Sequence, residues 1–212
     1  MRVTVFGASG KIGRLVVDRL LDDRNHVVAY VRDPAGIPWA HADLTVIVGE
    51  LTDSAAVRQA VEGSAAVISA LGPSRRRGAT GTPVADGTRI IVAAMDEADV
   101  HRYIGLATPS VPDSRDRRTL RAAFLPLIAK VRFPNALREL RGMTAAVTGS
   151  DLEWTIARIS RPVDRPGTGT LRVGFLGRDK VFSTMTRTDI AAFLIAQLTD
   201  DNFRRAAPAI SN

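Results

Sequence analysis

Three glycines near the start of the chain have the spacing of a phosphate-binding turn. Gly7, Gly10 and Gly13 form a Gly-x-x-Gly-x-x-Gly pattern, and an apolar, β-branched run precedes them. In such a turn the first glycine permits a sharp bend, the second lets a pyrophosphate approach the backbone, and the third lets the next helix pack closely. Free N–H groups at the helix N-terminus then favour an anion. The pattern predicts a dinucleotide site; the alternative is a turn whose glycines serve packing alone.

Residues within this turn and after later apolar runs complete the predicted cofactor site. Ser9 can donate a hydroxyl hydrogen bond, and Gly49–Asp53 stands where folds of this kind hold an adenine. The small residues of 70–72 allow close approach to a ribose. Ligands of open α/β sheets bind at the carboxyl ends of the strands, where these segments lie. The cofactor residues predicted on these grounds are Gly7, Ser9, Gly10, Lys11, Ile12, Gly13, Arg32, Glu50, Leu51, Ala70, Leu71 and Gly72.

The end of the second apolar run bears on which dinucleotide binds. That run continues into Arg32, Asp33 and Pro34. Related folds place an acid here for the ribose hydroxyls of NAD, or an arginine for the phosphate of NADP. Arg32 is the first polar group after the run, and its planar guanidinium suits a phosphate. We therefore expect NADP(H); the alternative is a solvated Arg32, with Asp33 binding the ribose.

The elements needed to hold this site alternate along the chain. Strands and helices of 8–15 residues in turn are typical of right-handed β-α-β units and a parallel sheet. A hairpin around Gly177 and a last helix capped by Thr188 are expected after them, and residues 161–169 are expected to form a loop. The expected strands are 2–6, 26–31, 44–48, 65–71, 102–107 and 154–159, and the expected helices are 11–21, 54–61, 84–98, 120–132 and 135–150.

Composition narrows the class of protein. The 212 residues are 45% hydrophobic and 24% charged, as in ordinary globular proteins. The absence of cysteine excludes a disulfide scaffold, a thiolate metal site and a cysteine nucleophile, and three histidines leave little for a metal site. The longest stretch without a charged residue, 63–74, is too short to cross a membrane. We expect a cytoplasmic, single-domain protein over residues 1–212, monomeric or homodimeric, without metal.

The net charge of +7 is concentrated in one segment. Residues 115–141 hold eight basic residues and two acids. An anionic partner is one interpretation of this segment, and a solvated surface is the other. Because the segment holds few aromatic residues that could stack on bases, we expect no nucleic acid partner. The Arg75-Arg76-Arg77 run and Arg161 could approach the mouth of the site, although a solvated loop accounts equally for the run.

Taken together, these segments resemble the NAD(P)H-binding atypical short-chain dehydrogenase/reductases, a group that includes flavin/biliverdin reductases and nitrogen-regulator-like redox sensors. The resemblance is carried by residues 7–13, 31–34, 49–53, 153–158 and 186–191. It implies a Rossmann-type, doubly wound parallel sheet with strand order 3-2-1-4-5-6, a short seventh strand and a small C-terminal substrate lobe formed mostly by residues 110–185. It also implies that the backbone at Arg158 and Ile159 meets the nicotinamide, although the two prolines usual after that arginine are missing.

The catalytic pair of the related short-chain dehydrogenases is missing as well. That pair is a tyrosine and a lysine four residues later, whereas this chain has only Tyr30 and Tyr103, neither followed by a lysine at that spacing. A serine of the flavin/biliverdin reductases aligns with Thr108. We take Thr108 and Ser110, after the fifth strand, as candidate catalytic residues that orient a substrate oxygen or relay a proton; the alternative is that they only cap the strand end.

The missing tyrosine bears on the reaction. Reducing a simple ketone makes an alkoxide, and a positioned acid contributes about 10²–10⁴ in rate. A flavin or quinone spreads the new charge and can take its proton from water. We therefore expect an NADPH-dependent oxidoreductase that passes hydride to a small-molecule acceptor such as a quinone or flavin. The alternatives are a non-catalytic NADP-binding redox sensor and, more weakly, an NAD(P)-dependent epimerase or isomerase.

Overall fold

The computed structural model describes residues 1–37, 40–73, 80–117, 134–181 and 184–212. The expected helix 120–132 and the Arg75-Arg76-Arg77 run lie outside these ranges. The helices are α1 (Lys11–Asp22), α2 (Ser54–Val61), α3 (Pro83–Glu97), α5 (Pro134–Thr148), α6 (Arg187–Ala196) and the 3-10 turn η1 (Pro34–Gly36). The strands are β1 (Arg2–Phe6), β2 (His26–Val31), β3 (Leu44–Val48), β4 (Ala66–Ser69), β5 (Arg102–Ala107), β6 (Glu153–Ile159), β7 (Arg161–Val163), β8 (Arg172–Gly174), β9 (Thr184–Thr186) and β10 (Ala209–Ser211).

The main sheet has the strand order β3-β2-β1-β4-β5-β6-β10-β8. The six strands from β3 to β6 pair in parallel, β10 adds a short parallel seventh strand beside β6, and β8 closes the edge in the antiparallel direction. The predicted order 3-2-1-4-5-6 is therefore confirmed. In a sheet of this order the chain leaves β1 and β4 toward opposite edges, so the crevice beyond their carboxyl ends is the expected ligand position.

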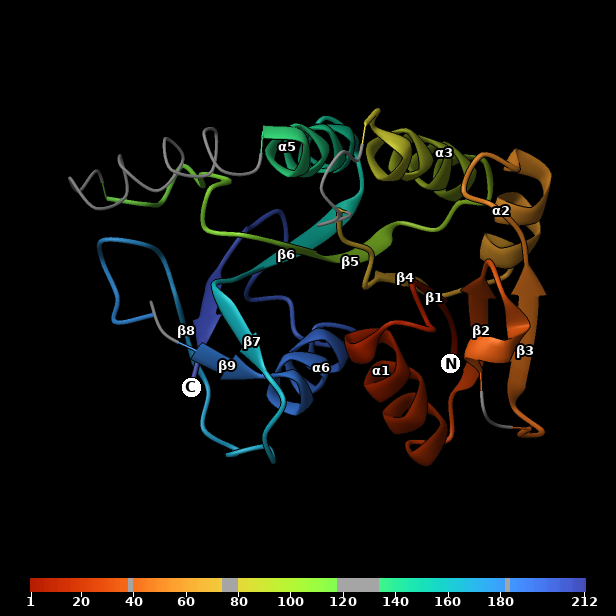
Figure 1. Ribbon diagram of the computed structural model, residues 1–212, viewed down its shortest axis with the longest axis horizontal. Helices are drawn as coiled ribbons and strands as arrows, with labels where there is room; N and C mark the ends of the chain where they lie inside the picture. Colours follow the sequence, from red (N-terminus) through yellow and green to blue (C-terminus); the bar gives the residue numbers. More distant parts are fainter. Residues whose placement is uncertain (38–39, 74–79, 118–133, 182–183) are drawn as a thin grey trace.

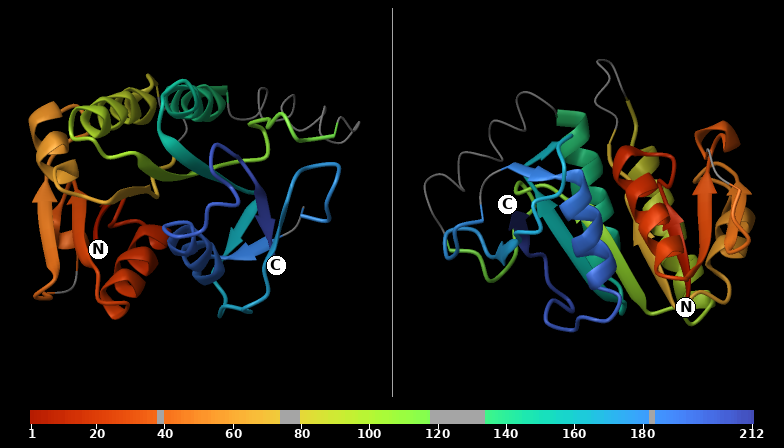
Figure 2. Two further views of the ribbon diagram at one scale, coloured as in Figure 1. Left: turned by 180° about the vertical axis from the view of Figure 1, so that it is seen from behind. Right: turned by 90° about the horizontal axis from the view of Figure 1, so that it is seen from below.

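Helices cover both faces of this sheet. Figure 1 shows α2, α3 and α5 on one side and α1 with α6 on the other, and Figure 2 shows α1 and α6 lying side by side. The two faces of β1 illustrate why: Val3 and Val5 pack toward α1 and α6, whereas Phe6 packs against the opposite layer. Successive strand residues point to opposite faces, so a run that is apolar throughout requires cover on both sides.

The second half of the chain differs in places from the sequence-based expectations. The hairpin expected between 171–175 and 180–185 is wrong: β8 pairs with β10, and β9 pairs in parallel with β7. The stretch expected to be a loop from residue 161 begins with β7. The turn does form, since Asp179 accepts a hydrogen bond from the Phe175 amide at 2.8 Å. A local turn reverses the chain, but it does not determine which strands pair. β8 instead pairs with the free edge of β10, and β9 pairs with β7.

Two helix starts depend on side chains. The cap of α6 is Thr186, not the expected Thr188: its hydroxyl accepts from the Asp189 amide at 3.1 Å. The start of α3 is held from another element, because the buried Glu139 carboxylate on α5 accepts from the Ala85 amide at 2.8 Å and the Val84 amide at 3.3 Å. An anion at a helix N-terminus satisfies otherwise unpaired N–H groups. Glu139 therefore fixes α3 against α5.

Candidate cofactor and acceptor site

The glycine turn joins β1 to α1 with the geometry expected of a phosphate cradle. Gly7 has φ +75°, a left-handed conformation that favours glycine. The Gly10 amide donates to the Gly7 carbonyl at 3.0 Å, and Gly10 is the extended residue that precedes the helix. A Cβ at Gly13 would stand 2.1 Å from the Gly7 oxygen, so the helix can start this close only with glycine there. Gly10 has no side chain to cap the helix, which leaves its first N–H groups for a ligand.

Two other predicted cofactor segments touch this turn. A Cβ at Gly7 would meet the Ala70 carbonyl carbon at 3.0 Å and the Leu71 nitrogen at 3.1 Å, at the end of β4. On the other side, a Cβ at Gly36 would lie 2.7 Å from the Ser9 Cβ, so the η1 turn after β2 packs on the glycine loop. The structure therefore brings the loops after three parallel strands together at one edge of the sheet.

The segment after β2 separates the roles of Arg32 and Asp33. The Asp33 carboxylate already accepts a hydrogen bond from the Ala35 amide at 2.9 Å and caps η1. Arg32 is exposed, and no hydrogen bond or ion pair joins its side chain to the described part of the chain. At this strand end Asp33 thus already has a partner, whereas the side chain of Arg32 has none among the described residues.

The predicted adenine segment is held by Tyr30 of β2. The Tyr30 hydroxyl donates to the Glu50 carbonyl at 2.8 Å and lies against the backbone at Gly49. Burial and the nearby carboxylates of Asp53 and Glu50 raise the pKa of Tyr30 to about 12. Leu51 packs on α3 at Gly87, where an added Cβ would stand 2.5 Å from the leucine Cβ. Tyr30 is therefore a neutral structural donor that fixes this loop, and it is not poised as an acid.

The candidate catalytic hydroxyls lie directly after β5. The Thr108 and Ser110 side-chain oxygens are 2.6 Å apart and hydrogen-bonded, and the Val111 amide closes the turn on the Thr108 carbonyl at 3.0 Å. Both side chains are partly exposed. Because β1, β4 and β5 are parallel neighbours, this pair lies at the same sheet edge as the glycine turn. The hydroxyls can exchange a proton with each other, but no cationic partner among the described residues bonds to them.

Tyr103 has no access to that edge. It is 3% exposed within β5 and packs beneath α3 and α5. Burial raises the pKa of Tyr103 to about 12. Like Tyr30, it belongs to the framework, and neither tyrosine is placed to protonate a substrate oxygen.

Arg158, predicted to lie near the nicotinamide, is fully buried at the end of β6. Its guanidinium donates to the Asp116 carboxylate at 2.6 and 2.7 Å and to the Val111 carbonyl at 3.1 Å. Burial alone would raise the pKa of Asp116, but the hydrogen bonds from Arg158, Asp113 and Leu176 lower it below its ordinary value. The arginine side chain thus anchors the loop after β5. Contact of Arg158 and Ile159 with the cofactor stays a prediction about their backbone.

An ion network connects the glycine turn to the second half of the chain. Lys11, the first residue of α1, donates to Asp164 at 2.8 Å, and Arg187 at the start of α6 donates to the same carboxylate. These hydrogen bonds and charges lower the pKa of Asp164. The sequence assigned Lys11 to the cofactor, but its partner, 153 residues further on, had no local signal. The contact places the loop after β7 beside the phosphate cradle.

Asp189 is a second carboxylate that the sequence did not single out. It is buried at the start of α6 and accepts hydrogen bonds from the Thr186 hydroxyl, the Thr168 and Gly169 amides, and the Asn212 side chain. Burial would raise the pKa of Asp189, but these donors outweigh it and lower the pKa to about 2. One carboxylate therefore ties α6 to loop 167–170 and to Asn212, which follows β10. The Thr-x-x-Asp spacing before an apolar helix was its sequence signal.

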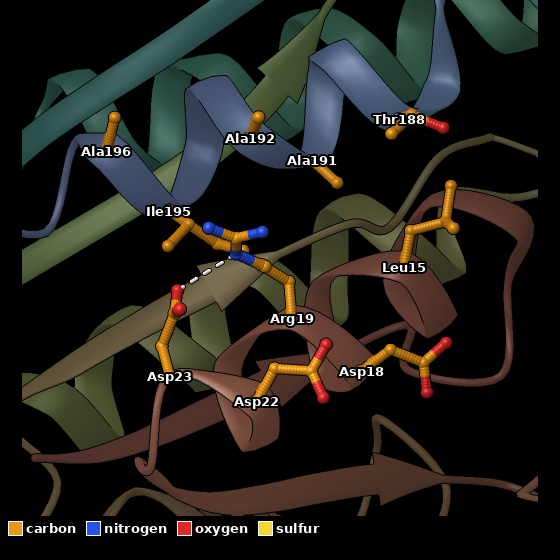
Figure 3. A pocket seen from close by; sticks show the side chains of 10 residues that line it. All are labelled: Leu15, Asp18, Arg19, Asp22, Asp23, Thr188, Ala191, Ala192, Ile195 and Ala196. Carbon is orange, nitrogen blue, oxygen red and sulfur yellow. Dashed lines mark hydrogen bonds and ion pairs between the residues drawn. The ribbon is translucent and has the colours of Figure 1, made fainter. Parts of the chain in front are cut away.

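A groove between α1 and α6 lies away from this edge (Figure 3). Its volume is about 470 Å³, and its walls carry Leu15 and Ile195 with acidic side chains along one rim. Arg19 and Asp23 form an exposed ion pair at 3.1 Å on that rim. None of the lining residues belongs to the glycine turn or to a strand end. The groove is thus a separate feature of the outer helical layer.

The strand order, the crevice and the glycine turn define a dinucleotide-binding Rossmann fold. The family model described as NAD(P)H-binding matches residues 7–201, and the chain belongs to this family. Its fold is thus NAD(P)H-binding and oxidoreductase-like, as the sequence predicted. No helix in the described ranges is long and apolar enough to cross a membrane.

Named relatives agree with this assignment. A 3-beta-hydroxysteroid dehydrogenase from Mycolicibacterium neoaurum is 34% identical over 125 residues, which are 52% of this chain but only 32% of that protein. ChuY, described as an anaerobillin reductase from Escherichia coli O157:H7, superposes with a TM-score of 0.81 at 20% identity and covers 100% of this chain and 97% of its own. A short-chain dehydrogenase/reductase from Veillonella parvula, solved in complex with NADP, gives 0.77 at 20% identity, with coverages of 100% and 94%. The chain thus spans about a third of the length of that dehydrogenase, and the family to which it belongs is NAD(P)H-binding.

Proposed function

We propose that this chain is an NADPH-dependent reductase that transfers a hydride to a conjugated acceptor such as a quinone or flavin. The observation that carries the proposal is the hydroxyl pair of Thr108 and Ser110, 2.6 Å apart, at the sheet edge that also bears the glycine turn. Substrate must bind where the nicotinamide end of a dinucleotide would lie, and this pair is the polar feature of β5 at that edge.

The choice of NADPH over NADH rests on the end of β2. Asp33 is engaged in capping η1, whereas Arg32 is exposed and unengaged. A guanidinium can form two charge-assisted hydrogen bonds with a phosphate. The NADP of the Veillonella parvula structure is consistent with this choice. The alternative use of Asp33 for the ribose would have to share its carboxylate with the η1 cap.

The residues of the cradle fit a pyrophosphate. The turn keeps open the space that a side chain at Gly10 would fill, and the first N–H groups of α1 face it. The Lys11 ammonium adds positive charge there, shared with Asp164. When bound, the nicotinamide supplies the hydride; these residues bind and orient the dinucleotide, and proximity of donor and acceptor then supplies most of the acceleration.

The proposed class of acceptor follows from the lack of a tyrosine placed to protonate the substrate. Hydride addition to a simple ketone produces an alkoxide that needs a proton at once, and both tyrosines are buried, with pKa values of about 12. Thr108 and Ser110 can donate hydrogen bonds to an acceptor oxygen but are weak acids. A quinone or flavin delocalises the charge of the incoming hydride and takes its proton from water, so positioning by these hydroxyls is sufficient.

The test is oxidation of NADPH against a panel of quinones, flavins and simple ketones. We expect turnover with conjugated acceptors and none with simple ketones. Efficient reduction of a simple ketone would contradict the proposal, since it requires an acid that the described residues at this sheet edge do not supply. Tight NADPH binding without turnover of any acceptor would instead favour the non-catalytic redox sensor.

A further inference from the structure

A second polar cavity lies beside the carboxyl end of β6. Its volume is about 470 Å³, and its lining residues are Arg115, Arg117, Arg178 and Asp179. Two come from the loop after β5 and two from the turn after β8. Three guanidinium groups and one carboxylate give this cavity an excess of two positive charges. Like charges held in one place repel each other, so the arrangement favours an anionic ligand.

The side chains of the cavity retain bonding capacity for such a ligand. Arg115 is oriented by the Phe175 ring, 5.2 Å from its guanidinium carbon, and by the Arg205 carbonyl at 3.2 Å. No hydrogen bond or ion pair joins the side chain of Arg117 or Arg178 to any described residue. The Asp179 carboxylate is occupied by the Phe175 amide at 2.8 Å. The acid therefore holds the turn, and no ion pair joins it to Arg117 or Arg178 within the described residues.

The two loops that carry the arginines are held together by backbone contacts. The Arg117 amide donates to the Leu176 carbonyl at 2.8 Å, and the Leu176 amide donates to Asp116 at 2.9 Å. Asp116, between Arg115 and Arg117, is in turn locked to the buried Arg158. A binding site whose frame is fixed before the ligand arrives loses less entropy on binding. Arg158 thus sets the position of the cavity.

This frame relates the cavity to the acceptor site. Ala107 pairs in register with Arg158 across β5 and β6, and Thr108 follows Ala107 directly. The loop anchored by Arg158 is therefore the continuation of the strand end that carries the hydroxyl pair. Arg32, at the end of β2, is four strands from β6, or about 19 Å at the usual strand spacing. The cavity lies on the acceptor side, away from the expected position of the NADPH ribose phosphate.

We propose that this cavity binds an anionic group, a phosphate monoester or carboxylate, that is part of the acceptor. The inference rests on the proposed reductase function and narrows its substrate class to conjugated acceptors that carry an acidic side chain. Arg117 and Arg178 contact the anion, Arg115 adds charge from a fixed position, and the Thr108–Ser110 pair orients the conjugated part. The cofactor's own phosphate is the other possible source of an anion, and the test separates the two.

Flavin mononucleotide and riboflavin make a matched pair of probes, because they share one ring system and differ in a terminal phosphate. Binding of each is measured by flavin fluorescence in the presence of NADP⁺, and turnover by NADPH oxidation. We expect wild-type protein to bind the mononucleotide at least about tenfold more tightly, as for one charge-assisted pair. Arg117→Gln and Arg178→Gln should each weaken its binding and raise its KM about tenfold, without changing kcat or riboflavin binding. Arg138→Gln, an exposed arginine on α5, is the control and should change nothing.

Each outcome bears on the inference. Equal affinities for the two flavins in the wild type, or equal losses for both in the arginine variants, would overturn it. A fall in NADPH affinity in those variants, with flavin binding unchanged, would assign the cavity to the cofactor and also overturn it. Tighter binding of the mononucleotide that depends on both arginines, without turnover of either flavin or of any quinone, would support the anion site while contradicting the reductase proposal.

Discussion

The guanidinium of Arg158 and the carboxylate of Asp116 form a buried, two-pronged ion pair, with N–O distances of 2.6 and 2.7 Å. It joins the end of β6 to the loop that follows β5. The arginine is fully buried, and the side chain of Asp116 is 14% exposed. The loop after β5 that holds Asp116 also carries Arg115 and Arg117. The ion pair therefore fixes the proposed anion cavity relative to β6. The resemblance drew attention to Arg158, but the residue that neutralises it lies 42 positions away.

Breaking this pair should destabilise the fold. Arg158→Met removes the cation but leaves Asp116 largely buried, at a cost of about 3 kcal/mol in the free energy of unfolding. The measurement is urea denaturation of both proteins. Arg19→Met is the matched control: it removes one partner of the exposed Arg19–Asp23 pair and should cost less than about 0.5 kcal/mol. Similar losses in the two variants would show that the buried pair has no special role.

Asp189 gives the protein an acid-dependent component of stability. Its pKa is about 2 in the folded protein, below the ordinary 3.8, so its contribution is complete above about pH 4 and is lost as the pH falls toward 2. Asp189→Asn replaces the carboxylate oxygen that accepts from the Thr168 amide and the Asn212 side chain by an NH2 group, so that donors face a donor. We expect it to cost about 1.5–3 kcal/mol at neutral pH.

The pH dependence distinguishes this effect from simple loss of packing. In Asp189→Asn, the difference from wild type should shrink as unfolding is measured at successively lower pH between 4 and 2. Asp151→Asn, at a fully exposed carboxylate, should stay within about 0.5 kcal/mol of wild type. A difference for Asp189→Asn that is constant over this range would contradict the assignment of its pKa.

The first half of the fold could be predicted from sequence because its signals are local. The glycine turn, the apolar runs and the helical spacings each lie within a few residues. Their alternation predicts a parallel sheet, and the family resemblance implied its strand order. The second half depends on pairings between distant segments. β8 joins β10 rather than β9, and Asp164 bonds to Lys11 across most of the chain. No short-range pattern encodes such partners.

The candidate site likewise has one part that could be predicted from local sequence signals and another that depends on contacts between distant segments. Gly7, Ala70 and Leu71 were each predicted from strand ends, and the structure brings them into contact. The Thr108–Ser110 pair was found for a similar reason. The cluster at Arg115 and Arg178 needed tertiary structure, since the basic segment 115–141 suggested an anionic partner but did not indicate which arginines meet. Charge composition gives the sign of a surface, whereas the position of a site depends on which loops pack together.

Arg32 should determine the choice of cofactor. We expect the wild type to bind NADPH at least about tenfold more tightly than NADH, because a charge-assisted pair with phosphate contributes on the order of 1.5–3 kcal/mol. Arg32→Ala should remove this preference and leave NADH affinity unchanged, as measured by titrating each nucleotide. Asp33→Asn keeps an η1 cap and is the control. A variant lacking Arg32 that still prefers NADPH would contradict the role of Arg32, and an NADH affinity lowered by Asp33→Asn would show that Asp33 binds the ribose.

Gly10 and Gly13 should fail in different ways when substituted. A Cβ at Gly10 meets only the Gly7 oxygen, at 3.1 Å, so Gly10→Val should fold but block the phosphate and abolish NADPH binding. A Cβ at Gly13 would overlap that oxygen at 2.1 Å, so Gly13→Ala should cost about 1–3 kcal/mol in stability. Thermal unfolding and NADPH titration separate the two effects. Unchanged NADPH affinity in Gly10→Val would show that the glycines of this turn serve packing alone.

Thr108 and Ser110 should act as one positioning unit and not as an acid. Thr108→Ala should slow quinone reduction by less than about 10²-fold, the low end of general-acid contributions, with NADPH affinity unchanged. Because the two hydroxyls bond to each other at 2.6 Å, Ser110→Ala should produce a similar loss, and the double variant should lose less than the product of the two. The measurement is kcat and KM for one quinone across pH 6–9. A loss greater than about 10³-fold, or the disappearance of a pH-dependent limb of kcat in Thr108→Ala, would mean that this hydroxyl transfers the proton.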